Sequence, residues 1–159
     1  MAVVLNVYFS LGSNLGDREK NIYEALRRMD EAFGRHYETL SQLVETVPVG
    51  FSGGKFLNCA VLYRISSSHP AMEVLEKVKS VERAMGRTDP PEYDADGGRI
   101  YHSRIIDIDI LFYGKERMDT PLLTIPHKGI ADREFVLVPL REIARPSLRR
   151  AFPEYFRKR

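Results

Sequence analysis

The sequence has few of the residues that build disulfides and metal knuckles, and no long apolar runs. Cys59 is the only cysteine, which excludes an intrachain disulfide and a C-x-x-C knuckle and fits a reducing cytoplasm. No apolar run is long enough to span a membrane. The apolar residues 2–5 lack the basic segment and cleavage site of a signal peptide. We therefore expect a cytoplasmic protein with no membrane partner.

Internal repeats, low-complexity tracts and a strong net charge are absent as well. The net charge is +2, although residues 141–159 hold seven basic side chains against two acidic ones. Such a basic segment is more often solvated surface than a nucleic-acid site, so we expect no nucleic-acid partner. Hydrophobic residues at 43% and charged residues at 29% are ordinary for a globular protein. A length of 159 residues predicts one domain over 1–159, and we expect a monomer.

The order of predicted elements indicates an α+β fold. Two amphipathic helices are expected, one ending at Gly34 and one at Gly86. With the strands, the order is β-α-β-β-α-β plus trailing elements, a ferredoxin-like antiparallel sheet with helices packed on one face. Residues 87–103 lack periodicity and predict a long exposed loop. The predicted strands cover residues 3–11, 36–44, 56–65, 103–113 and 122–125, and from 132 onward the chain has a mixed or helical end.

The strand predicted at 103–113 carries the most specific chemistry. Because strand side chains alternate, Asp107 and Asp109 share one face. Their Cα atoms are then roughly 6.5–7 Å apart, and at an effective dielectric near 20 they repel by about 2–3 kcal/mol. A bound Mg²⁺ relieves that repulsion, while the alternative is an acidic pair on a solvated sheet face. The opposite, apolar face is predicted to hold Ile106, Ile108, Ile110 and Phe112.

Elsewhere, polar and aromatic residues gather near the predicted element ends. No candidate nucleophile has a base at a recognisable spacing, and carboxylates, arginines and a histidine without a nucleophile fit phosphoryl transfer. The glycine-rich stretch at 12–16 lacks the lysine of a phosphate-binding loop, so it is predicted to be a structural turn.

The order and spacing of five motifs carry a family resemblance. They are S-L-G-S-N-L-G-D from Ser10, R-I-I-D-I-D-I from Arg104, I-P-H from Ile125, R-E-F-V-L from Arg133 and P-L-R-E-I-A at 139–144. Together they cover nearly the whole chain, which resembles the 6-hydroxymethyl-7,8-dihydropterin pyrophosphokinases of folate biosynthesis. The resemblance implies that the pyrophosphoryl group of ATP moves to the hydroxymethyl oxygen of the pterin and that AMP is released.

The resemblance also implies a phosphate-binding half of the site. Two Mg²⁺ ions would be held by Asp107 and Asp109, with ATP as the co-substrate. Arg87 and Arg104 match family arginines that hold the transferred group, and guanidinium pairs two oxygens at once. The residues implied to bind ATP are Glu82, Arg87, Arg104, Ile110, Thr124, His127 and Arg133.

A pterin-binding half is implied by the same resemblance. The pterin would stack between Phe56 and Phe135, which without the resemblance would be read as core aromatics. Asn58 would match the donor and acceptor edge of the ring. The other implied pterin contacts are Thr46, Val47, Val49, Gly50 and Tyr101. The loop at 87–103 would close over the substrates, and we expect its motion to limit turnover.

Four residues depart from the family pattern. Phe56 replaces a common tyrosine, Tyr101 a tryptophan, Leu122 an ATP-binding arginine and Lys128 an aromatic residue. The changes at Leu122 and Lys128 bear on nucleotide affinity. Two alternative functions therefore stay open: a metal-dependent nucleotide hydrolase, and a pterin- or nucleotide-binding module without catalysis.

Overall fold

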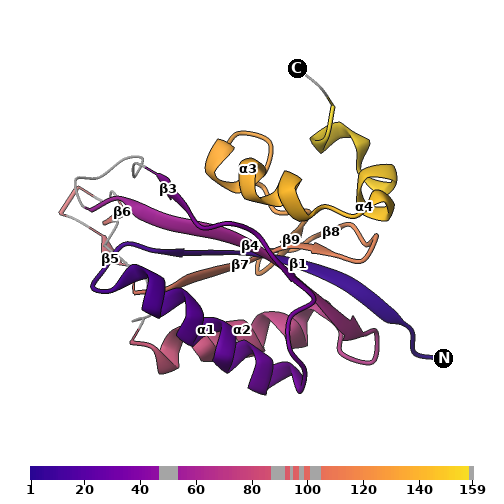
Figure 1. Ribbon diagram of the computed structural model, residues 1–159, viewed down its shortest axis with the longest axis horizontal. Coiled ribbons are helices and arrows are strands. Elements are labelled where there is room, and N and C mark those ends of the chain that lie inside the picture. Colours follow the sequence, from indigo (N-terminus) through magenta and orange to yellow (C-terminus); the bar gives the residue numbers. More distant parts are fainter. Residues whose placement is uncertain (47–53, 87–91, 94, 97–98, 101–104, 158–159) are drawn as a thin grey trace.

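A five-stranded antiparallel sheet forms the middle layer of the molecule (Figure 1). The computed structural model describes residues 1–46, 54–86, 92–93, 95–96, 99–100 and 105–157, of which 92–93 and 99–100 are described by their backbone alone. The strand order is β2-β4-β1-β7, and β3 also pairs with β4. The strands are β1 (Val4–Ser13), β2 (Thr39–Leu40), β3 (Val44–Thr46), β4 (Phe56–Ser66) and β7 (Asp107–Tyr113).

Helices cover both faces of this sheet (Figure 1). The helices α1 (Arg18–Phe33) and α2 (Ala71–Ala84) lie against one face, as predicted, and confirm the ferredoxin-like α+β fold. The trailing residues, for which only a mixed or helical end was predicted, cover the other face. They form α3 (Glu134–Ile143), α4 (Pro146–Ala151) and the short 3₁₀ helix η1 (Pro153–Tyr155).

The ends of α1 follow from local sequence. The side chain of Asp17 accepts a hydrogen bond from the backbone N–H of Lys20 at 3.1 Å, which satisfies a free donor of the first turn. Gly34 ends the helix with a φ of 68°, a left-handed conformation that glycine adopts without a Cβ penalty. The end at Gly34 was predicted correctly. The buried face between them consists of Ile22, Ala25, Leu26 and Met29.

Alternation along β1 divides the core into two layers. Phe9 and its alternate neighbours pack toward α1 and α2, whereas Tyr8 packs toward α3 and α4. The layer beneath α1 and α2 is apolar from Val7 to Leu11, since Val7, Phe9 and Leu11 are all fully buried there. The opposite layer is apolar around Tyr8 and changes at Ser10, which is a polar buried residue.

A bulge in β7 corrects the predicted apolar face of that strand. Phe9 pairs with Ile110 but Tyr8 pairs with Phe112, so Leu111 is an extra residue in β7. An extra residue shifts the alternation by one position. Phe112 therefore packs with the α3 and α4 layer, not with Ile110 as predicted.

Three other segments differ from the sequence prediction. The strand expected at 36–44 is two short strands, separated near Ser41, whose Oγ accepts a hydrogen bond from the N–H of Ala60 at 2.8 Å. The expected turn at 12–16 begins later, because β1 runs to Ser13. The loop expected at 87–103 contains the strands β5 (Glu92–Tyr93) and β6 (Arg99–Ile100), and a second pair is β8 (Met118–Asp119) with β9 (Thr124–Ile125).

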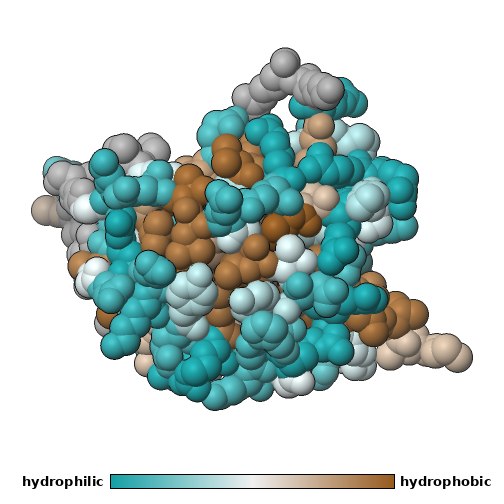
Figure 2. Space-filling model, in the orientation of Figure 1, coloured by the Kyte–Doolittle hydropathy of each residue, from teal (hydrophilic) through white to brown (hydrophobic). Residues whose placement is uncertain are grey.

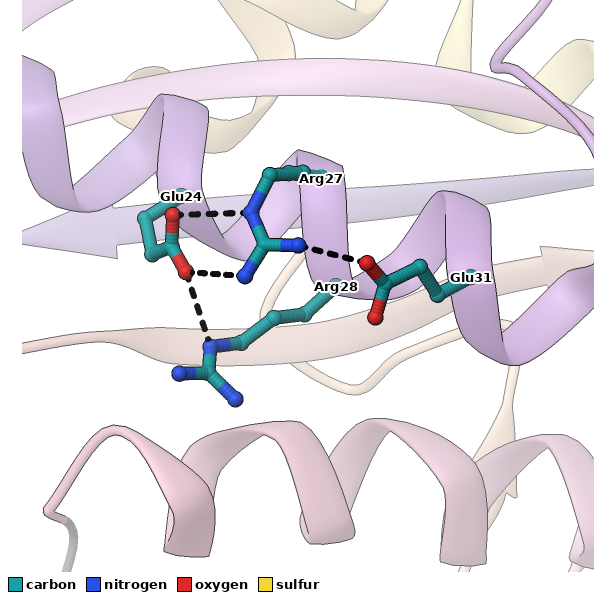
Figure 3. A network of polar contacts seen from close by, with 4 residues as sticks. All are labelled: Glu24, Arg27, Arg28 and Glu31. Atoms are coloured by element: carbon teal, nitrogen blue, oxygen red, sulfur yellow. Dashed lines mark hydrogen bonds and ion pairs between the residues drawn. The ribbon is translucent and has the colours of Figure 1, made fainter.

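The surface carries polar networks and one apolar region. Figure 3 shows Arg27 of α1 between Glu24 and Glu31. The guanidinium nitrogens of Arg27 lie 2.6 Å from Oε1 of Glu24 and 2.5 Å from Oε1 of Glu31, and Arg28 also forms an ion pair with Glu24. These pairs are exposed and add little to stability, although the hydrogen bond from Arg27 lowers the pKa of Glu24. Figure 2 shows apolar surface gathered beside α3, where Val138 is exposed. Within the described ranges, no helix combines the length and apolarity needed to cross a membrane.

Burial of Cys59 predicts a loss of stability at high pH. Burial raises the pKa of this thiol from 9.0 to about 12. A raised folded-state pKa means that the stabilisation is fully present below pH 9.0 and is lost as the pH rises toward 12. Raising the pH from 7.5 to 10 should lower the free energy of unfolding of both the wild type and Cys59→Ala. The decrease should be larger in the wild type by about 1.4 kcal/mol, the energy that corresponds to one pKa unit.

Urea unfolding of both proteins at the two pH values gives this difference directly. The variant is the control for every other titratable group, because both proteins share those groups. Equal pH dependence in the two proteins would contradict a buried, protonated Cys59.

Candidate active site

The pairing of β1 places residues of three strands in one row. Gly12 lies opposite Asn58 of β4 and opposite Asp107 of β7. Residues directly opposite in an antiparallel sheet have side chains on the same face. Asn58, predicted to bind pterin, and Asp107, predicted to bind metal, thus lie on either side of Gly12 on the face that α3 covers.

The absence of a side chain at Gly12 makes room for that row. A Cβ at this position would lie 2.7 Å from Oδ1 of Asn58 and 3.5 Å from the ring of Phe56. Both side chains therefore lie over the backbone of β1. Asn58 is 5% exposed, and its Nδ2 donates a hydrogen bond to Oγ1 of Thr46 at 2.5 Å. Three predicted pterin contacts are thereby brought together.

Sequence reasoning missed Gly12, because it assigned residues 12–16 to a turn. The signal was available: a glycine inside a strand often marks close approach of another group. Figure 1 shows the β1 end that carries Gly12 at the same end of the molecule as β3 and the pair β5 and β6.

A second row brings Asp109 and His127 together. Asp109 lies opposite Ser10, and its Oδ1 is 3.7 Å from Nε2 of His127. The backbone N–H of His127 donates to the carbonyl of Leu111 at 3.1 Å, which fixes the histidine beside β7. The N–H of Gly129 donates to Nδ1 of His127 at 3.0 Å. Nδ1 is then an acceptor, so neutral His127 carries its proton on Nε2, on the side of Asp109.

Glu82 supports the same strand from below. It lies on α2, is 2% exposed and accepts a hydrogen bond from the N–H of Ile108 at 2.8 Å. β7 is the outer strand of the sheet, so this donor has no strand partner. Glu82 therefore fixes the backbone between Asp107 and Asp109. Its predicted contact with ATP stays a prediction.

The segment from β9 to α3 supplies the remaining described residues. Arg133 precedes α3, and its guanidinium is 5.8 Å from the ring centre of the half-buried Phe135. Thr124 is half-buried, and its Oγ1 donates to Asp119 at 3.2 Å. The side chain of Ile110 is 2% exposed and lies in the core beneath the sheet, and its predicted place beside the nucleotide stays a prediction.

Several predicted positions lie outside the described residues or add nothing to the site. Leu122 is 75% exposed and Lys128 is also exposed. A cavity of about 590 Å³ between the beginning of β1 and α4 is lined by no predicted site residue. The predicted residues outside the described part of the chain are Val47, Val49, Gly50, Arg87, Tyr101 and Arg104.

The carboxylates suit magnesium better than a metal held by protein alone. Among the described residues no three histidines, cysteines or acids gather as a metal site. Mg²⁺ does not need such a cage, since it binds one or two carboxylates and completes its shell with water and substrate phosphate oxygens. Asp107 and Asp109 on one sheet face fit that requirement.

Known proteins similar to this chain agree on one family. Residues 8–145 match the family described as 7,8-dihydro-6-hydroxymethylpterin-pyrophosphokinase (HPPK). The chain is 40% identical over 140 residues to 2-amino-4-hydroxy-6-hydroxymethyldihydropteridine pyrophosphokinase of Porphyromonas gingivalis, covering 87% of this chain and 90% of that protein. It is 35% identical over 137 residues to the protein of the same name from Bacillus subtilis, covering 86% and 76%.

Longer relatives contain the similar region as a part. The folate synthesis bifunctional protein of Pisum sativum is 41% identical over 138 residues, which is 86% of this chain but 25% of that protein. A crystal structure of Plasmodium falciparum HPPK-DHPS has a TM-score of 0.63 at 15% identity, and the match covers 98% of this chain and 44% of that one. The structural likeness supports the fold.

Gly12→Ala should destabilise the protein through Asn58. The added Cβ forces Asn58 away from Thr46, and overpacking of this kind costs about 1–3 kcal/mol. In an Asn58→Ala background the same change should cost less, because the obstructing side chain is gone. Urea unfolding of the double-mutant cycle measures this coupling. Gly54→Ala is the control, since its Cβ would meet its nearest neighbour at 3.4 Å. Additive costs would contradict the close approach.

Removal of the Glu82 carboxylate should expose the Ile108 amide. Glu82→Ala leaves a buried N–H without its acceptor, at a cost of about 1–3 kcal/mol, whereas Glu82→Gln keeps an acceptor and should cost less. Hydrogen exchange followed by NMR should show faster exchange of the Ile108 amide in the alanine variant. Glu76→Ala on the exposed side of α2 serves as the control. Unchanged exchange in Glu82→Ala would rule out the support of β7.

Proposed function

Since the chain belongs to the 7,8-dihydro-6-hydroxymethylpterin-pyrophosphokinase family, its reaction is pyrophosphoryl transfer in folate biosynthesis, and we propose how the described residues carry it out. ATP donates the pyrophosphoryl group, the hydroxymethyl oxygen of 6-hydroxymethyl-7,8-dihydropterin accepts it, and AMP leaves. One observation supports this assignment above the others: Asn58 and Asp107 both lie opposite Gly12. The acceptor and the phosphates therefore bind on one face of the sheet, to the two strands that flank β1.

The pterin half of the site surrounds Gly12. Asn58 is held by Thr46 through its Nδ2, which leaves Oδ1 and the second amide hydrogen to pair with the pyrimidine edge of a pterin. Phe56, whose ring lies over Gly12, offers one stacking surface. Phe135 at the beginning of α3 offers the other, and stacking of flat rings adds about 0.5–1.5 kcal/mol beyond area burial. A ring held in this way has its hydroxymethyl group free to face β7.

The phosphate half lies along β7 and the segment after β9. Nε2–H of neutral His127 is a donor on the side of Asp109, so it can reach a phosphate oxygen bound there. Arg133 adds a permanent positive charge at the beginning of α3, suited to a second phosphate oxygen. Asp107 and Asp109 would hold Mg²⁺, which would supply charge neutralisation of the phosphate oxygens.

In this scheme the enzyme accelerates the transfer by positioning the two substrates. No described side chain forms a covalent intermediate; the residues fix the acceptor oxygen near the β-phosphorus and stabilise the charge of the transferred group. Glu82 contributes by holding the backbone from which both carboxylates project. Arg87 and Arg104 keep their proposed role as ligands of the transferred group by family resemblance alone.

Asp109→Asn should abolish most of the turnover without loss of the fold. The substitution removes a carboxylate that repels Asp107, so the ligand-free protein should be as stable as the wild type or more stable. AMP formation with ATP, Mg²⁺ and the hydroxymethylpterin should fall at least about 100-fold, the size typical for losing one electrostatic stabiliser of a transition state. Glu116→Gln, in the turn after β7 and away from the site, should retain full activity.

The same assay distinguishes the alternatives. ADP or AMP release that does not depend on pterin would indicate a nucleotide hydrolase. Pterin binding without any turnover by the wild type would indicate a binding module. Full activity of Asp109→Asn would overturn the assignment of the metal to β7.

A further inference from the structure

Ser10 carries a buried hydroxyl that has no hydrogen-bond partner in the part of the chain that the structure describes. It is 7% exposed and lies in the middle of β1. Within the described ranges, no group donates a hydrogen bond to its Oγ or accepts one from it. The other two buried serines differ: Oγ of Ser13 accepts from Asn21 at 3.2 Å, and Oγ of Ser41 donates to the carbonyl of Gln42 at 2.8 Å. Buried polar groups normally have partners, so the exception at Ser10 requires an explanation.

The sheet register identifies the partner within reach. Ser10 lies between Ala60 of β4 and Asp109 of β7. Ala60 has no polar side-chain atom, which leaves the Asp109 carboxylate as the neighbouring acceptor in this row. Cβ atoms of opposite residues are about 4.5–5.5 Å apart, so a rotation about the Cα–Cβ bond of Ser10 brings its hydroxyl toward the carboxylate.

One carboxylate oxygen of Asp109 is available to accept such a hydrogen bond. Its Oδ1 is the atom nearer to Nε2 of His127, at 3.7 Å. A carboxylate has two oxygens and about four acceptor directions. With one oxygen on the histidine side, the orientation of the other is not fixed by any described hydrogen bond of the side chain. A donor at Ser10 would fix it.

We propose that Ser10 is a positioning residue for Asp109. When a divalent cation and nucleotide occupy the site, the Ser10 hydroxyl donates a hydrogen bond to the carboxylate and determines which oxygen faces the cation. The proposal rests on the proposed function, in which Asp109 is a metal ligand. Carboxylates that bind metals are generally held by further hydrogen bonds, and a hydrogen bond to a charged acceptor is stronger than a neutral one.

This role has opposite consequences in the free and the loaded protein. Without ligands the hydroxyl is buried and unpaired, so Ser10→Ala should leave the melting temperature unchanged or raise it. With ligands the variant lacks a bond that the wild type makes, so it should bind the cation more weakly. A purely structural serine would lower stability in both states and would not single out the cation.

The test is a titration of the protein with Mn²⁺ that is monitored by electron paramagnetic resonance. An ATP analogue is present, in which a methylene group joins the α- and β-phosphorus atoms. Ser10→Ala should raise the Mn²⁺ dissociation constant about 10-fold, the lower end of the effect of removing a partner of a metal ligand. Ser41→Ala is the matched control. It removes a buried hydroxyl that has partners, so it should lower the melting temperature and leave the Mn²⁺ dissociation constant unchanged.

Two results overturn the proposal on Ser10 alone. One is a Mn²⁺ dissociation constant of Ser10→Ala that equals the constant of the wild type. The other is an equal rise of that constant in Ser10→Ala and Ser41→Ala, which would reflect general loosening of the sheet. Failure of the wild type itself to bind Mn²⁺ with the nucleotide analogue would overturn the metal role of Asp109, and the role of Ser10 with it.

Discussion

The pairing of β1 with β4 on one side and β7 on the other is the constraint from which the site follows. Antiparallel register places Asn58 and Asp107 on the same face at the same level, with Gly12 between them. A slip of one residue would turn either set of side chains to the apolar layer beneath. The buried residues of that layer, contributed by all three strands and both helices, oppose such a slip.

The two faces of the sheet have different tasks. The face beneath α1 and α2 is apolar core from Val7 to Leu11 of β1. The opposite face is core only toward its far end, where Tyr8 meets Phe112 and Phe112 meets Phe152 at ring distances of 6.1 and 4.9 Å. The N–H of Arg145 donates to the Tyr8 hydroxyl at 3.1 Å, which ties the beginning of α4 to the sheet. The rest of this face is left for Ser10, Gly12 and their neighbours.

Local sequence was sufficient where a period or an end signal decides the structure. The end of α1 at Gly34 and the common face of Asp107 and Asp109 could be predicted, because a glycine and a two-residue period set them. The position of Phe112 could not, since a bulge depends on how β7 fits against β1. Nor could the bond from Ile108 to Glu82, because residues distant in sequence meet there through tertiary packing alone.

The central position of β1 also bears on the order of events during synthesis. This strand is made before β4 and β7: its partner β7 comes from the final third of the sequence, and His127 and Arg133 come later still. Contacts between residues so far apart in sequence close late, because the intervening loop must lose its freedom before they form. A ribosome-bound chain that has released only β1 to α2 has the strand that joins the two halves of the site but neither carboxylate of β7. Such a chain has no phosphate half, so ligand cannot stabilise it until β7 has docked.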